Sequence, residues 1–162
     1  MNKVYLLIGG NVGNRVQNLQ KAVELIDAGC GKITQQSPLY ETAAWGKTDQ
    51  PAFLNQALEL HTHLTAPALM TALLQAEEAM GRKRGEKFGP RIIDMDILLF
   101  NHDIINSDHI TVPHPQLANR RFALQPLADI AAAYVHPVLN KSIAGLLADC
   151  PDQLPVKKFS GH

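Results

Sequence analysis

The pattern of apolar and polar positions predicts a strand followed by a helix at the start of the chain. Residues 4–8 form a continuous apolar run closed by two glycines, which is typical of a buried central strand. Apolar residues then recur at helical spacing between Val16 and Ile26, and Gly29 is placed to end that helix. The chain therefore opens with a buried strand and one amphipathic helix.

A pair of strands is expected next. The segment from Ile33 to Thr42 is rich in β-branched and aromatic residues, although Pro38 interrupts it. After a polar loop, residues Phe53 to Thr62 have the composition of another strand. We expect these two segments to pair as antiparallel neighbours.

A second helix and a further strand complete the pattern. Thr65 can cap a helix that has Pro67 in its first turn, and apolar residues mark one face of this helix until Gly81. Residues Asp94 to Phe100 then form another apolar strand. The order strand, helix, strand, strand, helix, strand predicts an α+β fold. The expected architecture is a ferredoxin-like α/β sandwich, an antiparallel sheet with helices packed on one face of it.

The remainder of the chain is expected to be rich in loops. Residues 101–103 have the composition of a turn, and residues 111–115 contain too many prolines for a regular element. Short helices are predicted over residues 122–133 and 142–148. With 162 residues and 46% hydrophobic content, the chain is long enough for one buried core, so we expect a single domain over residues 1–162.

The charge balance and the cysteine content narrow the function classes. Fifteen basic and fifteen acidic side chains cancel, so no overall field would hold the protein on a nucleic acid or an anionic membrane. The apolar run 4–8 is too short for a signal-peptide core or a membrane span, and we expect a cytoplasmic location. Cys30 and Cys150 lack metal-type spacing and are expected to be reduced thiols.

Two carboxylates at the start of the last predicted strand are the clearest candidates for chemistry. Because side chains alternate across a sheet, Asp94 and Asp96 must share one face. Two neighbouring oxygen ligands on a rigid strand suit magnesium, which prefers a few protein oxygens together with phosphate and water. The alternative is a solvated strand end, or a pair neutralised by the nearby arginines.

A basic loop leads directly into these carboxylates. Residues 81–91 contain five cations between glycines, and guanidinium groups offer planar, multidentate donors to phosphate oxygens. A polyphosphate could lie between the loop and the carboxylates, with magnesium removing the repulsion. Alone, such a loop would be an ordinary solvated surface. There is no G-x-x-x-x-G-K-[ST] motif, and Ile8 stands where a dinucleotide-binding fingerprint needs its first glycine.

Aromatic side chains offer a place for a flat ring. His114, Arg120 and Phe122 lie close together in the sequence. A planar heteroaromatic could be held between Phe53 and Phe122, with the amide of Asn55 donating and accepting at its edge. Core packing is the alternative for both phenylalanines, and a surface or packing role is the alternative for His114.

Taken together, these motifs resemble the 6-hydroxymethyl-7,8-dihydropterin pyrophosphokinase family across nearly the whole chain. The resemblance rests on Gly9-Gly10-Asn11, Asp49-Gln50-Pro51 with Phe53-Leu54-Asn55, Gly81-Arg82, Val112-Pro113-His114 and, most specifically, Gly89-Pro90-Arg91-Ile92-Ile93-Asp94-Met95-Asp96-Ile97. It implies an ATP-dependent diphosphokinase that transfers the pyrophosphoryl group of ATP to 6-hydroxymethyl-7,8-dihydropterin and releases AMP, a step of folate biosynthesis.

The resemblance also implies roles for particular residues. Asp94 and Asp96 would hold two magnesium ions that bridge the ATP phosphates, and Arg82 and Arg91 would complete the catalytic group. Positions that match ATP contacts are Glu77, Arg84, Lys87, Arg91, Ile97, Ile110, Thr111, His114 and Arg120. Positions that match the pterin pocket are Thr42, Ala43, Trp45, Phe53, Asn55, Phe88, Asp94 and Phe122.

The chain departs from the family pattern at three places. Many relatives carry Arg-Trp where this chain has Lys87-Phe88, and a tyrosine is frequent at the position of Phe53. A Thr-x-Pro sequence is also frequent where Thr42 is followed here by Ala43-Ala44. Lysine keeps the positive charge without the guanidinium fork, and phenylalanine keeps a ring without the indole donor.

Two other functions are weighed against this one. Ferredoxin-like sheets also serve as non-catalytic RNA-binding modules, but the neutral charge and the missing aromatic RNP-type strand motif disfavour that class. The second alternative is another ATP-dependent phosphotransferase or nucleotidyltransferase built on paired aspartates, which would differ in its products. We expect small-molecule substrates only, with no nucleic acid or membrane partner, and a monomer.

Overall fold

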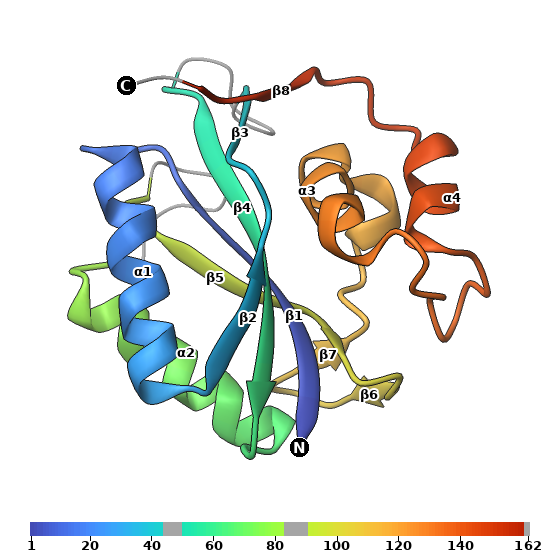
Figure 1. Ribbon diagram of the computed structural model, residues 1–162, viewed down its shortest axis with the longest axis horizontal. Helices are drawn as coiled ribbons and strands as arrows, with labels where there is room; N and C mark the ends of the chain where they lie inside the picture. Colours follow the sequence, from blue (N-terminus) through green and yellow to red (C-terminus); the bar gives the residue numbers. More distant parts are fainter. Residues whose placement is uncertain (44–49, 83–90, 161–162) are drawn as a thin grey trace.

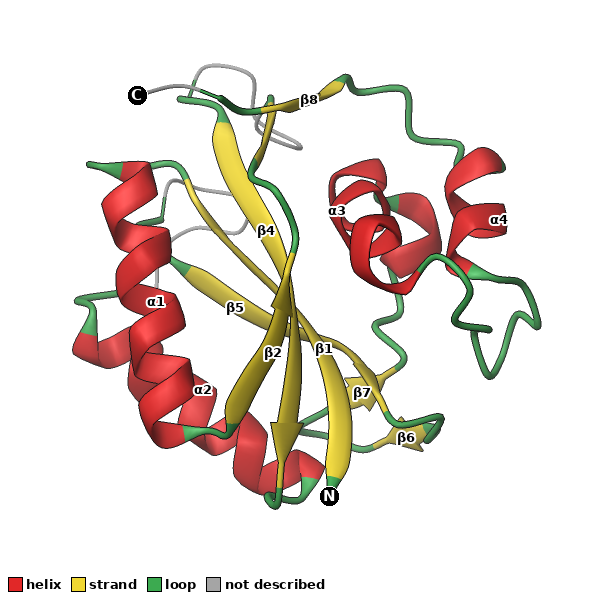
Figure 2. Cartoon of the chain, viewed as in Figure 1, coloured by secondary structure: helices red, strands yellow, loops and turns green. Residues whose placement is uncertain are grey.

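The computed structural model describes residues 1–43, 50–82 and 91–160, and an antiparallel sheet forms its centre (Figures 1 and 2). The strands lie in the order β5-β1-β4-β3-β8, and β2 also pairs with β4. Their bounds are β1 Asn2–Gly10, β2 Lys32–Gln36, β3 Tyr40–Thr42, β4 Phe53–Thr62, β5 Asp94–Phe100 and β8 Val156–Lys158. This order and the antiparallel pairing confirm the predicted ferredoxin-like α+β class.

The central strand β1 pairs with β4 and β5 along its two edges, and its side chains are buried on both faces of the sheet. Side chains alternate along it, so Val4, Leu6 and Ile8 enter one hydrophobic cluster. Tyr5 and Leu7 enter a second cluster on the opposite face. This double burial explains why the sequence shows a continuous apolar run here instead of alternation.

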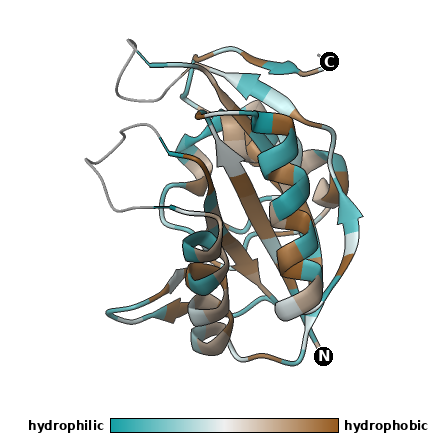
Figure 3. Ribbon diagram, turned by 90° about the vertical axis from the view of Figure 1, so that its left-hand side faces the viewer, coloured by the Kyte–Doolittle hydropathy of each residue, from teal (hydrophilic) through white to brown (hydrophobic). Residues whose placement is uncertain are grey.

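Helices α1 (Arg15–Gly29) and α2 (Ala66–Ala79) cover the first face, as predicted. The side chain of Asn14 caps α1 by accepting a hydrogen bond from the backbone N–H of Gln17, and Thr65 caps α2 in the same way. Figure 3 shows the strands between the helices as mainly apolar, with polar positions on the outer sides of the helices.

The opposite face is covered by the C-terminal helices, which corrects the expectation of helices on one face only. Helices α3 (Arg121–Ala131) and α4 (Ile143–Ala148) follow a 3-10 turn, η1 (Leu117–Asn119), and share a hydrophobic cluster with Tyr5 and Leu7. Figure 1 shows both helices on the side of the sheet opposite α1 and α2. The βαββαβ pattern ends at Phe100 and could not show what covers this second apolar face. No helix in the described ranges is long and apolar enough to cross a bilayer.

Three short strands lie outside the predicted pattern. Strands β6 (Ile105–Asn106) and β7 (Thr111–Val112) pair with each other, so the proline-rich stretch does contain a short regular element. The third is β8, which pairs with β3 near the end of the chain. Elements of two or three residues are too short to produce a periodic pattern, and pairing with a distant segment decides them.

Candidate active site

A cleft of about 350 Å³ lies where β1 and β3 end and β4 and β5 begin. These strands form one wall, the end of α2 forms a second, and the segment that leads into α3 forms a third. The lining residues are Leu7, Gly9, Thr42, Ala43, Phe53, Asn55, Met70, Leu74, Glu77, Arg82, Arg91, Asp94, Met95, Asp96, His114, Arg120 and Phe122. Residues far apart in the sequence thus meet in one concave site.

Strand β5 brings both predicted carboxylates into the cleft. Met95 and Ile97 pack into the cluster beneath α1 and α2. Because successive side chains on a strand point to opposite faces, Asp94 and Asp96 are directed to the other side. The Asp-x-Asp spacing therefore places two carboxylates together at the edge strand of the sheet.

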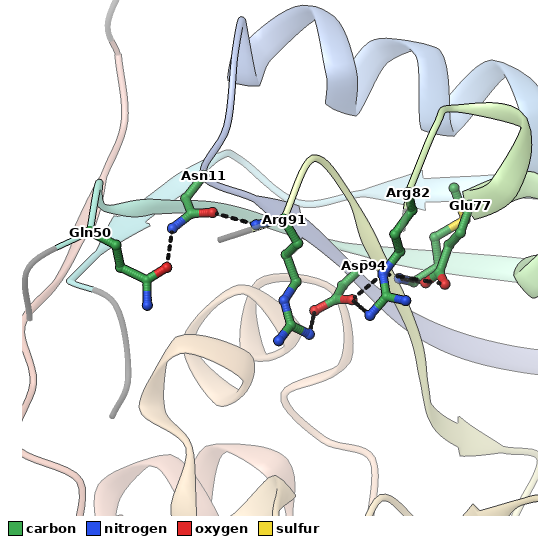
Figure 4. Close-up of polar contacts among 7 residues, drawn as sticks. Asn11, Gln50, Glu77, Arg82, Arg91 and Asp94 are labelled. Atoms are coloured by element: carbon green, nitrogen blue, oxygen red, sulfur yellow. Dashed lines mark hydrogen bonds and ion pairs between the residues drawn. The ribbon is translucent and has the colours of Figure 1, made fainter. Parts of the chain in front are cut away.

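Two guanidinium groups hold Asp94 from both sides (Figure 4). Arg82 lies with Nη2 2.9 Å from Oδ1 of Asp94. Arg91 donates from Nη1 to Oδ2 of the same carboxylate at 2.7 Å. Arg82 also lies with Nε 3.7 Å from Oε1 of Glu77. Paired guanidinium groups at the mouth of a cleft offer multidentate donors to an anion that carries several oxygens.

Glu77 is a buried carboxyl group beneath this pair, with 5% of its surface exposed. Its Oε2 accepts a hydrogen bond of 2.6 Å from the backbone N–H of Met95. Burial raises the pKa of Glu77 to about 7, and the Asp94 and Asp96 charges also raise it, although the Met95 amide and Arg82 act in the opposite direction. Glu77 therefore joins α2 to the start of β5 through this hydrogen bond.

Asp96 is a carboxylate whose surroundings disfavour its charged form. Burial and the neighbouring Asp94 raise its pKa to about 6, against the opposing charges of Arg120, Arg91 and Arg82. Among the described residues, no group of three or more His, Cys, Asp or Glu side chains could hold a metal ion. Two neighbouring carboxylates, with the pKa of Asp96 raised, fit a hard cation that takes its other oxygens from a substrate and water.

His114 acts as a neutral hydrogen-bonding group in this cleft. Burial and the Arg120 charge lower the pKa of His114 to about 4. Its Nδ1 accepts a hydrogen bond from the backbone N–H of Gln116 at 3.1 Å. The proton of the neutral ring therefore lies on Nε2, so His114 presents an N–H donor at physiological pH.

The aromatic side of the cleft carries the polar edge that the sequence predicted. Asn55 is 5% exposed and lies opposite Gly9 in the pairing of β1 with β4. A Cβ atom on Gly9 would lie 2.0 Å from Oδ1 of Asn55, so the missing side chain makes room for this amide. Phe53 and Phe122 both line the cleft, and Cζ of Arg120 lies 5.6 Å from the centre of the Phe122 ring.

Most of the candidates that the structure describes meet in the cleft. Ile97 and Ile110 instead lie in the hydrophobic core, and Thr111 is exposed on β7. Trp45, Arg84, Lys87 and Phe88 lie outside the described residues. The cleft is also lined by residues to which the sequence assigned no site role, namely Leu7, Gly9, Met70, Leu74 and Met95. Met70 and Leu74 lie on the same helix face as Glu77 by their spacing, and this pattern could have indicated that they line the cleft beside it.

Carboxylates facing guanidinium groups, beside two phenylalanines and an amide, define a site suited to a polyphosphate and a planar ring. Comparison with known proteins agrees with this class. Residues 5–132 match the family described as 7,8-dihydro-6-hydroxymethylpterin-pyrophosphokinase. The 2-amino-4-hydroxy-6-hydroxymethyldihydropteridine pyrophosphokinase of Aquifex aeolicus is 38% identical, over 88% of this chain and 89% of that protein. The chain belongs to the 7,8-dihydro-6-hydroxymethylpterin-pyrophosphokinase family.

Longer proteins also contain the matching region. The folic acid synthesis protein fol1 of Pneumocystis carinii is 39% identical over 87% of this chain, which spans 19% of that protein. A crystal structure of the HPPK-DHPS protein of Plasmodium falciparum matches with a TM-score of 0.75 at 19% identity. That match covers 91% of this chain and 43% of the longer one, and at this identity it supports the fold alone.

Proposed function

We propose that this chain transfers the pyrophosphoryl group of ATP to the hydroxymethyl oxygen of 6-hydroxymethyl-7,8-dihydropterin, releasing AMP, as a step in folate biosynthesis. Family membership supports this reaction. The observation that carries it is the meeting of Asp94 and Asp96 with Arg82, Arg91 and an aromatic wall in one cleft. A triphosphate needs cations and a metal site, and the acceptor needs a flat pocket, within reach of one another.

Asp94 and Asp96 are the residues that would hold magnesium, and we propose two ions bound together with ATP. Magnesium would supply charge neutralisation along the triphosphate and hold its oxygens for an in-line displacement. The carboxylates suit this role because the raised pKa of Asp96 indicates an environment that disfavours an isolated anion.

The side chains of the cleft would act mainly by positioning and by stabilising charge. The acceptor hydroxyl oxygen forms a bond to the β-phosphorus of ATP as the bond from that phosphorus to the bridging oxygen of AMP breaks. Arg82 and Arg91 would stabilise charge on the transferred group, and the Nε2–H of His114 would donate to ATP. Water or a phosphate oxygen can take the hydroxyl proton, since a neutral His114 with its proton on Nε2 is a donor here.

The acceptor ring would lie at the aromatic side of the cleft. Phe53 and Phe122 would contact its faces, and the Asn55 amide would donate to and accept from its edge, beside Thr42 and Ala43. Phe53→Ala and Phe122→Ala should each weaken pterin binding by about 1–3 kcal/mol, taking base stacking on aromatic rings as the guide. Titration calorimetry measures this loss. Equal losses for the pterin and for a MgATP analogue would indicate damaged packing instead.

Product analysis tests the reaction itself. Purified protein with magnesium and ATP should form AMP only when the pterin alcohol is present. ADP as the product would indicate an ordinary kinase, and free pyrophosphate would indicate a nucleotidyltransferase. RNA binding without AMP formation would favour the non-catalytic alternative. The proposal includes a monomer working in the cytoplasm, and size-exclusion chromatography with light scattering measures the oligomeric state.

A further inference from the structure

We infer that Asn11, at the end of β1, is a positioning residue that couples the pterin side of the cleft to its phosphate side, an inference that rests on the proposed function. Asn11 does not line the cleft. It follows the Gly9-Gly10 pair, which does not belong to a dinucleotide-binding fingerprint. With 2% of its surface exposed, it is a buried polar residue whose hydrogen bonds must all be found inside the protein.

On the phosphate side, Asn11 forms two hydrogen bonds with Arg91, and Figure 4 shows the one that its side chain accepts. The backbone N–H of Asn11 donates to the carbonyl of Arg91 at 3.0 Å. The backbone N–H of Arg91 donates to Oδ1 of Asn11, also at 3.0 Å. The backbone of Arg91 is thus fixed to the end of β1, and its guanidinium group reaches Asp94 from there. This arrangement resembles one extra rung of a β-ladder added beyond the strand.

On the pterin side, the Nδ2 group of Asn11 uses both of its protons. It donates to Oε1 of Gln50 at 2.9 Å and to the carbonyl of Pro51 at 2.9 Å. Two residues further on, Phe53 begins β4 in the aromatic wall. The partners also settle the orientation of the Asn11 amide, because the Arg91 N–H can only donate and the Pro51 carbonyl can only accept.

Gly10 brings the two sides close enough for one side chain to reach both. A Cβ atom on Gly10 would lie 2.3 Å from the carbonyl oxygen of Ile92, which is backbone and cannot rotate away. The segment at 91–92 therefore packs directly on the end of β1. Asn11 is the residue at which the Gln50–Pro51 segment, β1 and the Arg91 backbone all meet, so a shift on one side is transmitted to the other through a single buried amide.

The test measures how MgATP changes pterin affinity. Calorimetric dissociation constants for the pterin alcohol, with and without a saturating non-hydrolysable MgATP analogue, give a coupling factor. Asn11→Ala should lower that factor by about five- to tenfold, within the usual range of coupling between sites. The affinity for the analogue alone should change by less than about threefold, because the side chains proposed to contact ATP are not replaced. Steady-state kinetics should show a higher KM for the pterin at saturating ATP.

Gln50→Ala and Asn18→Ala complete the design. Gln50→Ala keeps the bonds from Asn11 to Arg91 and Pro51, so it should lower the coupling factor in the same direction, and the double variant should add little. If Asn11→Ala does not fold, Gln50→Ala still tests the inference. Asn18 donates from Nδ2 to the carbonyl of Val12, next to Asn11, and Asn18→Ala should keep the wild-type coupling factor.

The outcomes separate this inference from the proposed function. An unchanged coupling factor in both Asn11→Ala and Gln50→Ala, or an equal fall of both binary affinities, would assign Asn11 to packing only. An equal loss of coupling in Asn18→Ala would also overturn the inference. If the wild type makes no AMP but loses coupling in Asn11→Ala, the proposed reaction fails and the positioning role stands.

Discussion

Two regions of the sheet bury carboxylates in opposite ways. Glu59 lies on β4 about 20 Å from the cleft end of that strand, from the rise of a β-strand, and is 5% exposed. Tyr5 and Thr34 donate hydroxyl protons to its carboxylate at 2.9 and 2.6 Å, and Lys3 lies 3.4 Å away. Burial acts to raise the pKa of Glu59, but these hydrogen bonds and the Lys3 charge bring it down to about 2.

In the cleft, Glu77 is as buried as Glu59 and Asp96 is partly buried, but neither has comparable compensation. Burial and mutual repulsion raise the pKa of Glu77 to about 7 and that of Asp96 to about 6. Glu59 has partners in the protein, so its charge supports the fold. The charge of Asp96 is costly until something else supplies a cation. Burial alone therefore does not mark a carboxylate as a candidate for function, whereas burial without sufficient partners does.

The largest expected effect is the loss of turnover when a cleft carboxylate is removed. Asp94→Ala or Asp96→Ala should lower AMP formation by about two to three orders of magnitude, the scale of losing one preorganised electrostatic group. The thermal midpoint of Asp96→Ala should stay level or rise, because the buried charge costs stability. Asp103→Ala, which changes an exposed aspartate just beyond β5, serves as the control. Near-normal turnover of Asp96→Ala at low magnesium would remove the proposed metal site.

Replacing Glu59 should lower the stability of the fold and leave turnover unchanged. Glu59→Gln leaves the Tyr5 and Thr34 hydroxyls with a weaker, partly donating partner, so the free energy of unfolding should fall by about 1–3 kcal/mol. Turnover per folded molecule should be unchanged, since Glu59 does not line the cleft. Urea unfolding at pH 7 measures the first quantity and AMP formation the second. A stable variant with reduced turnover would contradict the division between the two regions.

The contribution of the Glu59 carboxylate to stability should depend on pH. Its folded pKa of about 2 lies below its usual 4.5, so its contribution is fully present above pH 4.5 and is lost as the pH falls toward 2. The stability difference between the wild type and Glu59→Gln should therefore shrink steadily between about pH 5 and pH 2. Urea midpoints of both proteins across this range provide the measurement. A difference that grows on acidification would show that Glu59 has a raised pKa instead.

The smallest expected effect comes from one hydroxyl of this network. Thr34→Val keeps the shape and removes the 2.6 Å hydrogen bond to Glu59, which should cost about 0.5–1.5 kcal/mol of unfolding free energy. Thr71→Val removes a hydroxyl that donates to the Pro67 carbonyl on the exposed side of α2, and serves as a control. Equal losses in both variants would mean that the Glu59 charge is not stabilised by Thr34.

Local patterns were sufficient for the longer elements, whereas the segment predicted as one strand from Ile33 to Thr42 forms two strands, β2 and β3. Strand β4 and strand β5 have the predicted bounds, and Thr65 caps α2 as expected. These features depend on periodicity and on capping within a few residues, which the sequence displays directly. The cover of the second face by α3 and α4 and the pairing of β8 with β3 depend on long-range packing, which local patterns do not contain.

The same division applies to the site. That Asp94 and Asp96 share one face follows from the sequence, because alternation along a strand is a local property. The sequence also contained the motif that led to the family. The folded structure was needed to find that Asn11 joins Gln50 to Arg91, and that the charge of Glu59 is compensated while that of Asp96 is not. Hydrogen-bond partners and desolvation depend on which distant segments meet, and this information exists only once the chain is folded.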